Sequence, residues 1–223
     1  VAFYVAPYIN AICRSGTIEE KTLTFESMLK HKAFEMLPST KRGHAPGEME
    51  QLVEQVMRVV TNVKNRQTRA QDASMEYLEN RIEKENMMDR KVLLFTLEPG
   101  KVDKNIAGLI ANKISAKYQR PSCMLTKVGD VYQGSARGYE MSGVTNFKDI
   151  CDETGCVNWT AGHQNAFGIS INADKIEEFL EKTDIALANM ASEPVYYVDY
   201  IYNGADVNPQ DILAISDLSD LWG

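Results

Sequence analysis

Residues 91–118, KVLLFTLEPGKVDKNIAGLIANKISAKY, contain the change of hydrophobic period that decides the fold. The run at 91–97 is short and continuously apolar, as in a strand buried on both faces of a sheet. The segment at 102–118 then has the spacing of a helix, with Asp103 as its expected N-cap and Arg120-Pro121 closing it. A buried strand followed by a helix predicts the start of an α/β arrangement.

Strands and helices continue to alternate after this unit. A tight turn at Gly129-Asp130 is expected to join two of the strands. The further expected elements are strands at 121–128, 130–136, 165–171 and 194–202, and helices at 145–154 and 173–191. This alternation predicts an α/β domain over about 91–190, with a central mixed sheet flanked by helices.

The chain before residue 91 has a mainly helical pattern. No glycine or proline occurs between Gly47 and Pro99, and apolar residues recur there at helical spacing. A continuous helix of roughly 38 residues would span about 57 Å. We therefore expect either one connector helix between domains or two helices that break near Thr61-Asn62.

The first fifty residues give weaker signals. Thr17 followed by Glu20 forms the pattern of a capping box and predicts a short helix after it. Residues 4–17 are expected to form a strand end or a loop, and residues 37–48 a loop rich in turn formers.

Composition indicates an ordinary globular chain of 223 residues, 44% hydrophobic and 25% charged. No apolar run approaches the ~18 residues of a membrane span, and no signal-peptide pattern is present, so we expect no membrane partner. The chain starts without methionine and both ends look cut, which predicts a segment of a longer protein. The four cysteines have no metal-ligand spacing, which favours reduced, partly buried thiols in a cytoplasmic protein.

Charge is distributed unevenly behind the net value of −7. Residues 91–150 have nine basic and five acidic side chains, whereas residues 151–223 have two basic and thirteen acidic ones. The basic middle could bind a polyanion, because the local field governs the encounter. The alternative is a dipolar surface without function.

Two short motifs have the chemistry of a phosphate site. The first is GSARG at 134–138, where Gly134 gives a flexible backbone, Ser135 a hydroxyl and Arg137 a forked cation. The second is GHQNAFG at 162–168, where a glycine allows close approach and His163 can face a ligand. The alternatives are a glycine-rich turn with a solvated arginine, and turn glycines beside an incidental histidine.

Two further motifs are NIAGLIANK at 105–113 and NAICR at 10–14. The first opens a helix, and a helix N-terminus favours an anion. Its Gly108 costs about 1 kcal/mol of helix stability relative to alanine, so we expect a packing or close-approach reason for it. No Asp/His-rich cluster, HExxH, GxSxG or P-loop occurs, which predicts a phosphate cradle without the means of activating water.

Taken in order, NAICR, a long helix with NRQ, NIAGLIANK, RPSCMLT, YQGSARG and GHQNAFGISI resemble the RecJ branch of the DHH phosphoesterases. Those proteins are exonucleases specific for single strands. The resemblance covers about residues 6–222. This chain departs from the family pattern at Cys13, Gly138, Ala161 and Phe167, which suggests a divergent, phage-type member.

The resemblance implies a domain order and a reaction. Residues 1–47 would be the tail of the catalytic DHH domain, 48–89 the connector helix, 90–191 the DHH-associated substrate-binding domain, and 192–223 the truncated start of an OB-like domain. The whole enzyme would hydrolyse single-stranded DNA from 5′ to 3′, in DNA repair and recombination. Its Mn²⁺ or Mg²⁺ would be bound by residues that precede this chain, so this segment alone would be inactive.

The resemblance also assigns roles to single residues. Arg14, Ser135 and Arg137 would hold phosphates of the strand, and His163 would be the catalytic residue that closes the site opposite the metals. Five residues beside them would complete the substrate site: Asn10, Asn105, Lys113, Gly134 and Gly162.

Two other functions remain open at this point. One is a phosphodiesterase for short oligonucleotides or cyclic dinucleotides, which would need a single nucleotide pocket. Residues 196–223 favour the long-strand enzyme, because the small phosphodiesterases tend to stop after the associated domain. The other is a binding module without catalysis that recruits DNA for a partner.

Overall fold

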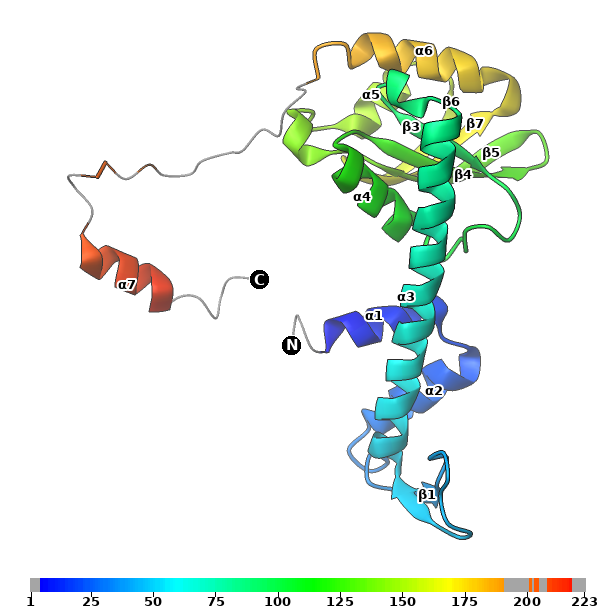
Figure 1. The fold of residues 1–223 in the computed structure, drawn as a ribbon, viewed down its shortest axis with the longest axis vertical. Helices are drawn as coiled ribbons and strands as arrows, with labels where there is room; N and C mark the ends of the chain where they lie inside the picture. The colour runs from blue at the N-terminus through cyan, green and yellow to red at the C-terminus, as the bar shows by residue number, and fades with distance from the viewer. Residues whose placement is uncertain (1–4, 191–200, 202, 205–207, 218–223) are drawn as a thin grey trace.

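A computed structural model of the chain describes residues 5–190, 201, 203–204 and 208–217 (Figure 1). Helices and a small hairpin come first, and a five-stranded sheet with helices on both faces follows. The expected α/β class with a mixed sheet is confirmed. None of the described helices is long and apolar enough to cross a membrane.

Helix α3, Leu52–Lys84, is a single helix of 33 residues that runs unbroken through Thr61-Asn62. At 1.5 Å per residue it is about 50 Å long. Its first half packs on α1 through Val60 and Val63, and its last turns pack under the sheet through Leu78 and Ile82 (Figure 1). The helix therefore joins the N-terminal helices to the sheet.

Helix α1, Ala6–Ser15, replaces the expected strand end or loop, so that prediction was wrong. Pro7 lies in the first turn, where a proline is favoured because its missing N–H would have no helical partner. Ala11 and Ile12 are buried against α3. Burial of this short apolar face stabilises the helix. The proline and glycine at its two ends had suggested a loop.

Helix α2, Ile18–Ser27, begins with the expected capping box. The Thr17 hydroxyl accepts the Glu20 N–H at 3.2 Å, and the Glu20 carboxylate accepts the Thr17 N–H at 2.8 Å. These two bonds satisfy donors that a bare helix end leaves without partners.

A two-stranded hairpin, β1 Met36–Pro38 and β2 Met49–Gln51, precedes α3. The expected loop at 37–48 therefore starts later than predicted, after Pro38. Glu50 of β2 is buried, and its carboxylate accepts the Thr40 N–H at 2.8 Å and pairs with Arg58 of α3. The bond from Arg58, followed by that from Thr40, lowers the pKa of Glu50 to about 2.

The sheet has the strand order β3-β4-β5-β7-β6. Its strands are β3 Leu93–Leu97, β4 Ser122–Val128, β5 Val131–Arg137, β6 Val157–His163 and β7 Ala166–Asn172. Strands β3 and β4 are parallel and are joined by α4, Ala107–Tyr118, and all other pairs are antiparallel. Strand β6 was not expected from the sequence. Helix α4 begins later than expected, and Asp103 accepts the Asn105 N–H at 2.8 Å in the turn before it.

Helices cover the two faces of the sheet differently (Figure 1). One core joins α3 and α4 to the sheet through Phe95, Ile110 and Met124. The other joins α5, Phe147–Glu153, and α6, Ile176–Ala186, to it through Phe167 and Phe179. Helix α4 packs on β4 and β5, so β7 and β6 extend past it. This leaves the β7–β6 half of the α4 face open.

The remaining elements are short. Three 3-10 turns are η1 Met87–Asp89, η2 Glu140–Ser142 and η3 Ala173–Lys175, and a final helix α7 spans Pro209–Asp217. The expected strand at 194–202 lies outside the described residues except for Ile201. Of the expected unit at 192–223, the structure describes residues 201, 203, 204 and 208 and helix α7.

Candidate functional site

Strand register brings three of the expected site residues onto one face of the sheet. Arg137 of β5 is opposite Ala166 of β7, and Ala166 is opposite His163 of β6. In the next row, Ser135 is opposite Gly168. Residues directly opposite one another point to the same face, so Ser135, Arg137 and His163 share the face that holds α4.

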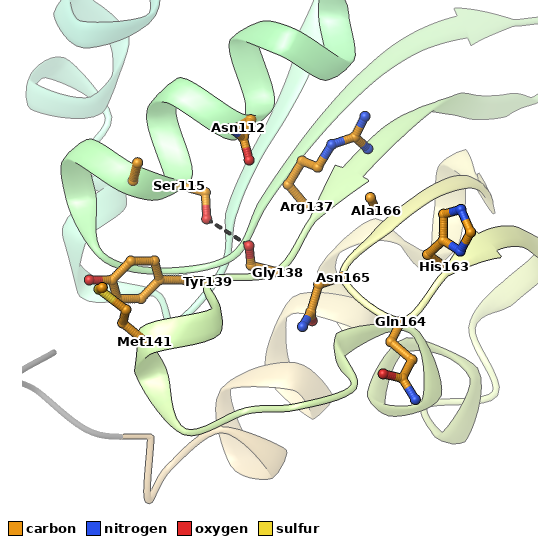
Figure 2. Close-up of a pocket in the computed structure, with 11 residues that line it drawn as sticks. Asn112, Ser115, Arg137, Gly138, Tyr139, Met141, His163, Gln164, Asn165 and Ala166 are labelled. Carbon is orange, nitrogen blue, oxygen red and sulfur yellow. Dashed lines mark hydrogen bonds between the residues drawn. The ribbon is translucent and has the colours of Figure 1, made fainter. Parts of the chain in front are cut away.

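Two adjoining hollows lie along this face and share Asn112 and Arg137; together we call them the groove. The hollow of about 370 Å³ is lined by Arg14, Lys104, Asn105, Gly108, Leu109, Asn112, Ser135 and Arg137. The hollow of about 460 Å³ is lined by Asn112, Ser115, Ala116, Arg137, Gly138, Tyr139, Met141, His163, Gln164, Asn165 and Ala166. Figure 2 shows Arg137 between Asn112 of α4 and Ala166, with His163 beyond Ala166. The groove thus runs from α1 across α4 to the end of β6.

Gly108 explains how the Arg137 side chain fits against α4. A Cβ atom at Gly108 would lie 2.5 Å from Arg137 Nη2 and 3.4 Å from Ser135 Oγ. Contacts as short as the first do not occur, so the glycine leaves the space that the guanidinium occupies. The expected close-approach reason for Gly108 is confirmed, and the side chains that approach are those of the predicted phosphate motif.

The groove concentrates positive charge. Arg137 is partly buried; burial and then the charge of Arg14 lower the pKa of its guanidinium, although an arginine stays protonated at any ordinary pH. Among the described side chains, none that lines the groove is Asp or Glu, and Arg14, Lys104 and Arg137 form no ion pair there. Cations that face one another without a carboxylate favour an anion between them.

His163 ends β6 and precedes the two-residue loop Gln164-Asn165 of the β6–β7 hairpin. Its neighbour Gly162 has φ 138°, and a Cβ there would lie 2.7 Å from the Ala166 carbonyl oxygen. The expected conformational need for glycine is confirmed. The alternative that Gly162 and Gly168 are turn residues is wrong, because both lie within strands.

Four of the expected substrate residues do not line the groove: Asn10, Lys113, Gly134 and Gly162. Asn10 and Lys113 are exposed on α1 and α4. A Cβ at Gly134 would lie only 1.9 Å from the Met124 carbonyl oxygen, so this glycine lets β5 approach β4. Close backbone contacts explain why positions 134 and 162 are glycines. That any of these four residues contacts a phosphate stays a prediction.

Two groove residues that the sequence reasoning missed lie on or before α4. Asn112 is four residues after Gly108 on α4, so the two share one side of the helix, and Lys104 lies four residues before Gly108 in the turn that precedes α4. This spacing is a signal that the sequence contained, because Gly108 had already been singled out.

Asn165, also missed, holds the loops at one end of the groove. Its carbonyl accepts the Gly138 N–H at 2.9 Å, and its side chain accepts the Phe147 N–H at 3.2 Å. A Cβ at Gly138 would lie 2.2 Å from Asn165 Oδ1. The Asn165 side chain therefore occupies the space that a side chain at position 138 would need, which explains the glycine at this departure from the family pattern.

The cysteines and the metal-binding types of side chain offer no further site. Cys123, Cys151 and Cys156 are buried and Cys13 is exposed, all as free thiols, which confirms the expected partial burial. Burial raises the pKa of the Cys123 thiol to about 12. Within the described part of the chain, no group of three or more His, Cys, Asp and Glu could hold a metal ion. The divalent metal that the resemblance implies therefore does not fit the residues described.

The chain is similar over almost its whole length to proteins named as exonucleases. Two curated relatives, an SPbeta prophage-derived single-strand DNA-specific exonuclease YorK of Bacillus subtilis strain 168 and yorK of Bacillus phage SPbeta, are 31% identical to it over 230 residues. The match covers 99% of this chain and 39% of each relative, so the chain spans well under half of their length. No family model matches the chain.

Solved structures show the same fold. RecJ of Thermus thermophilus in complex with Mg²⁺ matches 98% of this chain and 30% of its own length, with a TM-score of 0.58 and 17% identity. An exonuclease RecJ bound to manganese matches 85% of this chain and 41% of its own, with a TM-score of 0.51 and 15% identity. The chain is therefore similar in sequence to proteins named as single-strand DNA-specific exonucleases, and it shares the fold of the RecJ structures.

Proposed function

We propose that this chain is the strand-binding portion of a metal-dependent exonuclease that hydrolyses single-stranded DNA from 5′ to 3′. The observation that supports it best is the convergence of Arg14, Lys104 and Arg137 beside the Ser135 hydroxyl in one groove. Cations and a hydroxyl without a carboxylate suit a phosphate. The names of the relatives support single-stranded DNA as the source of that phosphate.

Each residue that the resemblance assigned to the substrate site has a role in this proposal. The guanidinium groups of Arg14 and Arg137 grip phosphate oxygens through paired N–H donors, and Ser135 donates its hydroxyl. Asn105 binds beside them, while Asn10 and Lys113 contact the strand where it leaves the groove. Gly134 and Gly162 act through the backbone, by allowing the close approaches that shape β5 and β6.

His163 lies two strands away from Arg137, about 10 Å by the usual strand spacing. We place it beside the scissile phosphate, where a hydrogen-bond donor stabilises the charge that develops in the transition state. In the full-length protein, His163→Ala should reduce kcat strongly and change strand affinity little. An unchanged kcat would leave this histidine as an incidental residue of the hairpin.

The metal dependence in this proposal is inferred only from similar proteins. RecJ has been solved with Mg²⁺ and with Mn²⁺, whereas the described part of this chain offers no group of ligands for either. We therefore place the metal on residues of the longer protein, and the domain bounds 1–47, 48–89, 90–191 and 192–223 form part of the same proposal. A cytoplasmic location fits an enzyme that acts on DNA.

The shape of the groove favours a strand over a short substrate. Each hollow has the size of a small-molecule site, and the two adjoin because Asn112 and Arg137 belong to both. A phosphate backbone that continues past Arg137 can occupy both hollows, whereas one nucleotide fills one of them.

The test uses the 223-residue chain and the full-length protein side by side. The chain should bind labelled single-stranded DNA more tightly than duplex DNA and should release no nucleotide with Mn²⁺. The full-length protein should release nucleotides from the 5′ end of a labelled strand first. Chelator-sensitive release by the chain alone would contradict the placement of the metal, and absence of strand binding would contradict the function itself.

A further inference from the structure

Trp159 is a large aromatic side chain that stays 46% exposed on the edge strand β6. The strand has a register shift between Val157 and Trp159. Val157 is opposite Ile171 and packs in the core under α5 and α6, whereas Trp159 is opposite Ser170. Residues two apart in a regular strand share a face, so the bulge is what turns Trp159 to the other face, the one that holds the groove.

The indole ring lies over Gly168 of the neighbouring strand. A Cβ at Gly168 would be 3.1 Å from Trp159 Cζ3 and 3.5 Å from Cη2, so the glycine leaves room for the ring. Gly168 is directly opposite Ser135 on β5. Because the ring lies over β7, it is about one strand spacing, roughly 4.8 Å, from Ser135 on β5, whose hydroxyl belongs to the proposed phosphate site.

The surroundings of Trp159 leave this part of the sheet free to accept a flat ligand. Ala161 on β6 and Ala166 and Gly168 on β7 are small residues on the same face, and the larger His163 lies farther along β6. Helix α4 does not extend over them, because it packs on β4 and β5. An indole lying on an open floor beside a cationic groove has the arrangement of a base-stacking surface in proteins that bind single strands.

We propose that Trp159 is the stacking platform for a nucleobase of the strand whose phosphate is held by Ser135 and Arg137. This inference rests on the proposed function and specifies the ligand further, as a nucleic acid with an unpaired, unstacked base. Because every base has a π face, the platform accepts all four bases. A duplex cannot use it, since its bases are stacked on one another.

A comparison of two DNA strands tests the platform. One is a short thymidine strand, and the other is an abasic strand of equal length with the same phosphates. Binding of both is measured by fluorescence anisotropy for the wild-type chain, Trp159→Ala, Trp159→Phe and, as a matched control outside the groove, Phe25→Ala, which removes another exposed aromatic. Quenching of indole emission on binding is followed in a Trp222→Phe background, because the chain has two tryptophans.

The wild-type chain should bind the thymidine strand more tightly than the abasic strand, by about five- to 150-fold, the range of one stacked base. Trp159→Ala should remove this difference without weakening the abasic strand, Trp159→Phe should keep part of it, and Phe25→Ala should keep all of it. The thymidine strand should quench Trp159 emission and the abasic strand should not.

Two results overturn the platform and are distinguishable from each other. If both strands bind equally well to the wild-type chain, with salt sensitivity, the platform is wrong and the phosphate groove stands. If neither strand binds, the proposed function is wrong as well. The wild-type comparison and the quenching decide the matter even if Trp159→Ala does not fold.

Discussion

At the scale of single residues, Arg137 is the group on which the groove depends most. It lines both hollows, and its guanidinium occupies the space that Gly108 leaves. Arg137→Ala should weaken binding of single-stranded DNA by about 1.5–3 kcal/mol, the usual loss of a hydrogen bond to a charged group. The loss should be the same at about pH 5.5 and pH 8, because arginine remains protonated at both. Anisotropy titrations at the two pH values measure it.

Arg137→Lys is the matched variant for this prediction. Lysine keeps the charge but lacks the planar fork of five donors, so it should recover part of the lost affinity. If Arg137→Ala binds like the wild type, the guanidinium is a structural cation of the β5–α4 packing and the phosphate assignment is wrong.

Gly108→Ala separates stability from binding at the same place. A new Cβ would meet Arg137 Nη2 at 2.5 Å, and that atom is the end of a flexible side chain that can move away. Replacing a helical glycine by alanine favours the helix by up to about 1 kcal/mol. We therefore expect an unchanged or higher free energy of unfolding in urea, together with weaker strand binding. Wild-type affinity in a stable Gly108→Ala chain would show that the position of Arg137 does not matter.

At the scale of elements, hydrophobic period and capping predicted most of the fold. The capping box before α2, the helical pattern of α3 and the strand–helix–strand unit around α4 were all visible in the sequence, because each has a strong local signal, whereas the sequence left open whether α3 breaks near Thr61-Asn62. Helix α1 was missed because Pro7 and Gly16 resemble loop punctuation, although both suit helix ends. Strand β6 was missed because it is an exposed edge strand with a bulge, so its residues do not alternate regularly.

Glu50 ties the β1–β2 hairpin to α3, and this link should depend on pH. Its pKa of about 2 lies below the unfolded value of about 4.3. Its stabilising contribution is therefore complete above about pH 4.3 and is lost as the pH falls toward 2. Glu50→Gln should lower the free energy of unfolding at pH 7, and the difference from the wild type should disappear near pH 2.

Urea unfolding at a series of pH values measures the Glu50 effect. Glu153→Gln is the control, because this glutamate of α5 is exposed and forms no ion pair with a described residue. A difference between Glu50→Gln and the wild type that stays constant from pH 7 to pH 2 would mean that the amide disturbs packing and that the ion pair with Arg58 is not the cause.

At the scale of the whole molecule, the groove is assembled from residues far apart in the chain. Arg14 of α1 and Arg137 of β5 meet because α3 joins the N-terminal helices to the sheet. No local pattern contains that proximity, so it could be expected only through the resemblance. Nothing in the sequence placed Trp159 at the groove either, because a bulge that reverses the direction of a side chain depends on strand pairing.

The distribution of charge over the molecule gives the last prediction. The chain has a net charge of −7, yet the groove is lined by Arg14, Lys104 and Arg137. Each phosphate neutralised on a single strand contributes about −0.7 to the slope of log affinity against log salt. The three cations of the groove alone therefore predict a slope of about −2, which is a loss of roughly 20-fold between about 50 and about 200 mM salt.

Two variants test whether the salt dependence comes from the cations of the groove. Arg14→Ala should make the slope shallower by about 0.7, because one phosphate contact is lost. Arg69→Ala should leave it unchanged, because this exposed arginine lies on α3 and does not line the groove. Equal changes in the two variants would mean that the strand responds to the diffuse field of the protein. A slope near zero in the wild type would mean that the ligand of the groove is not a polyanion, since release of counterions from phosphates always leaves this dependence on salt.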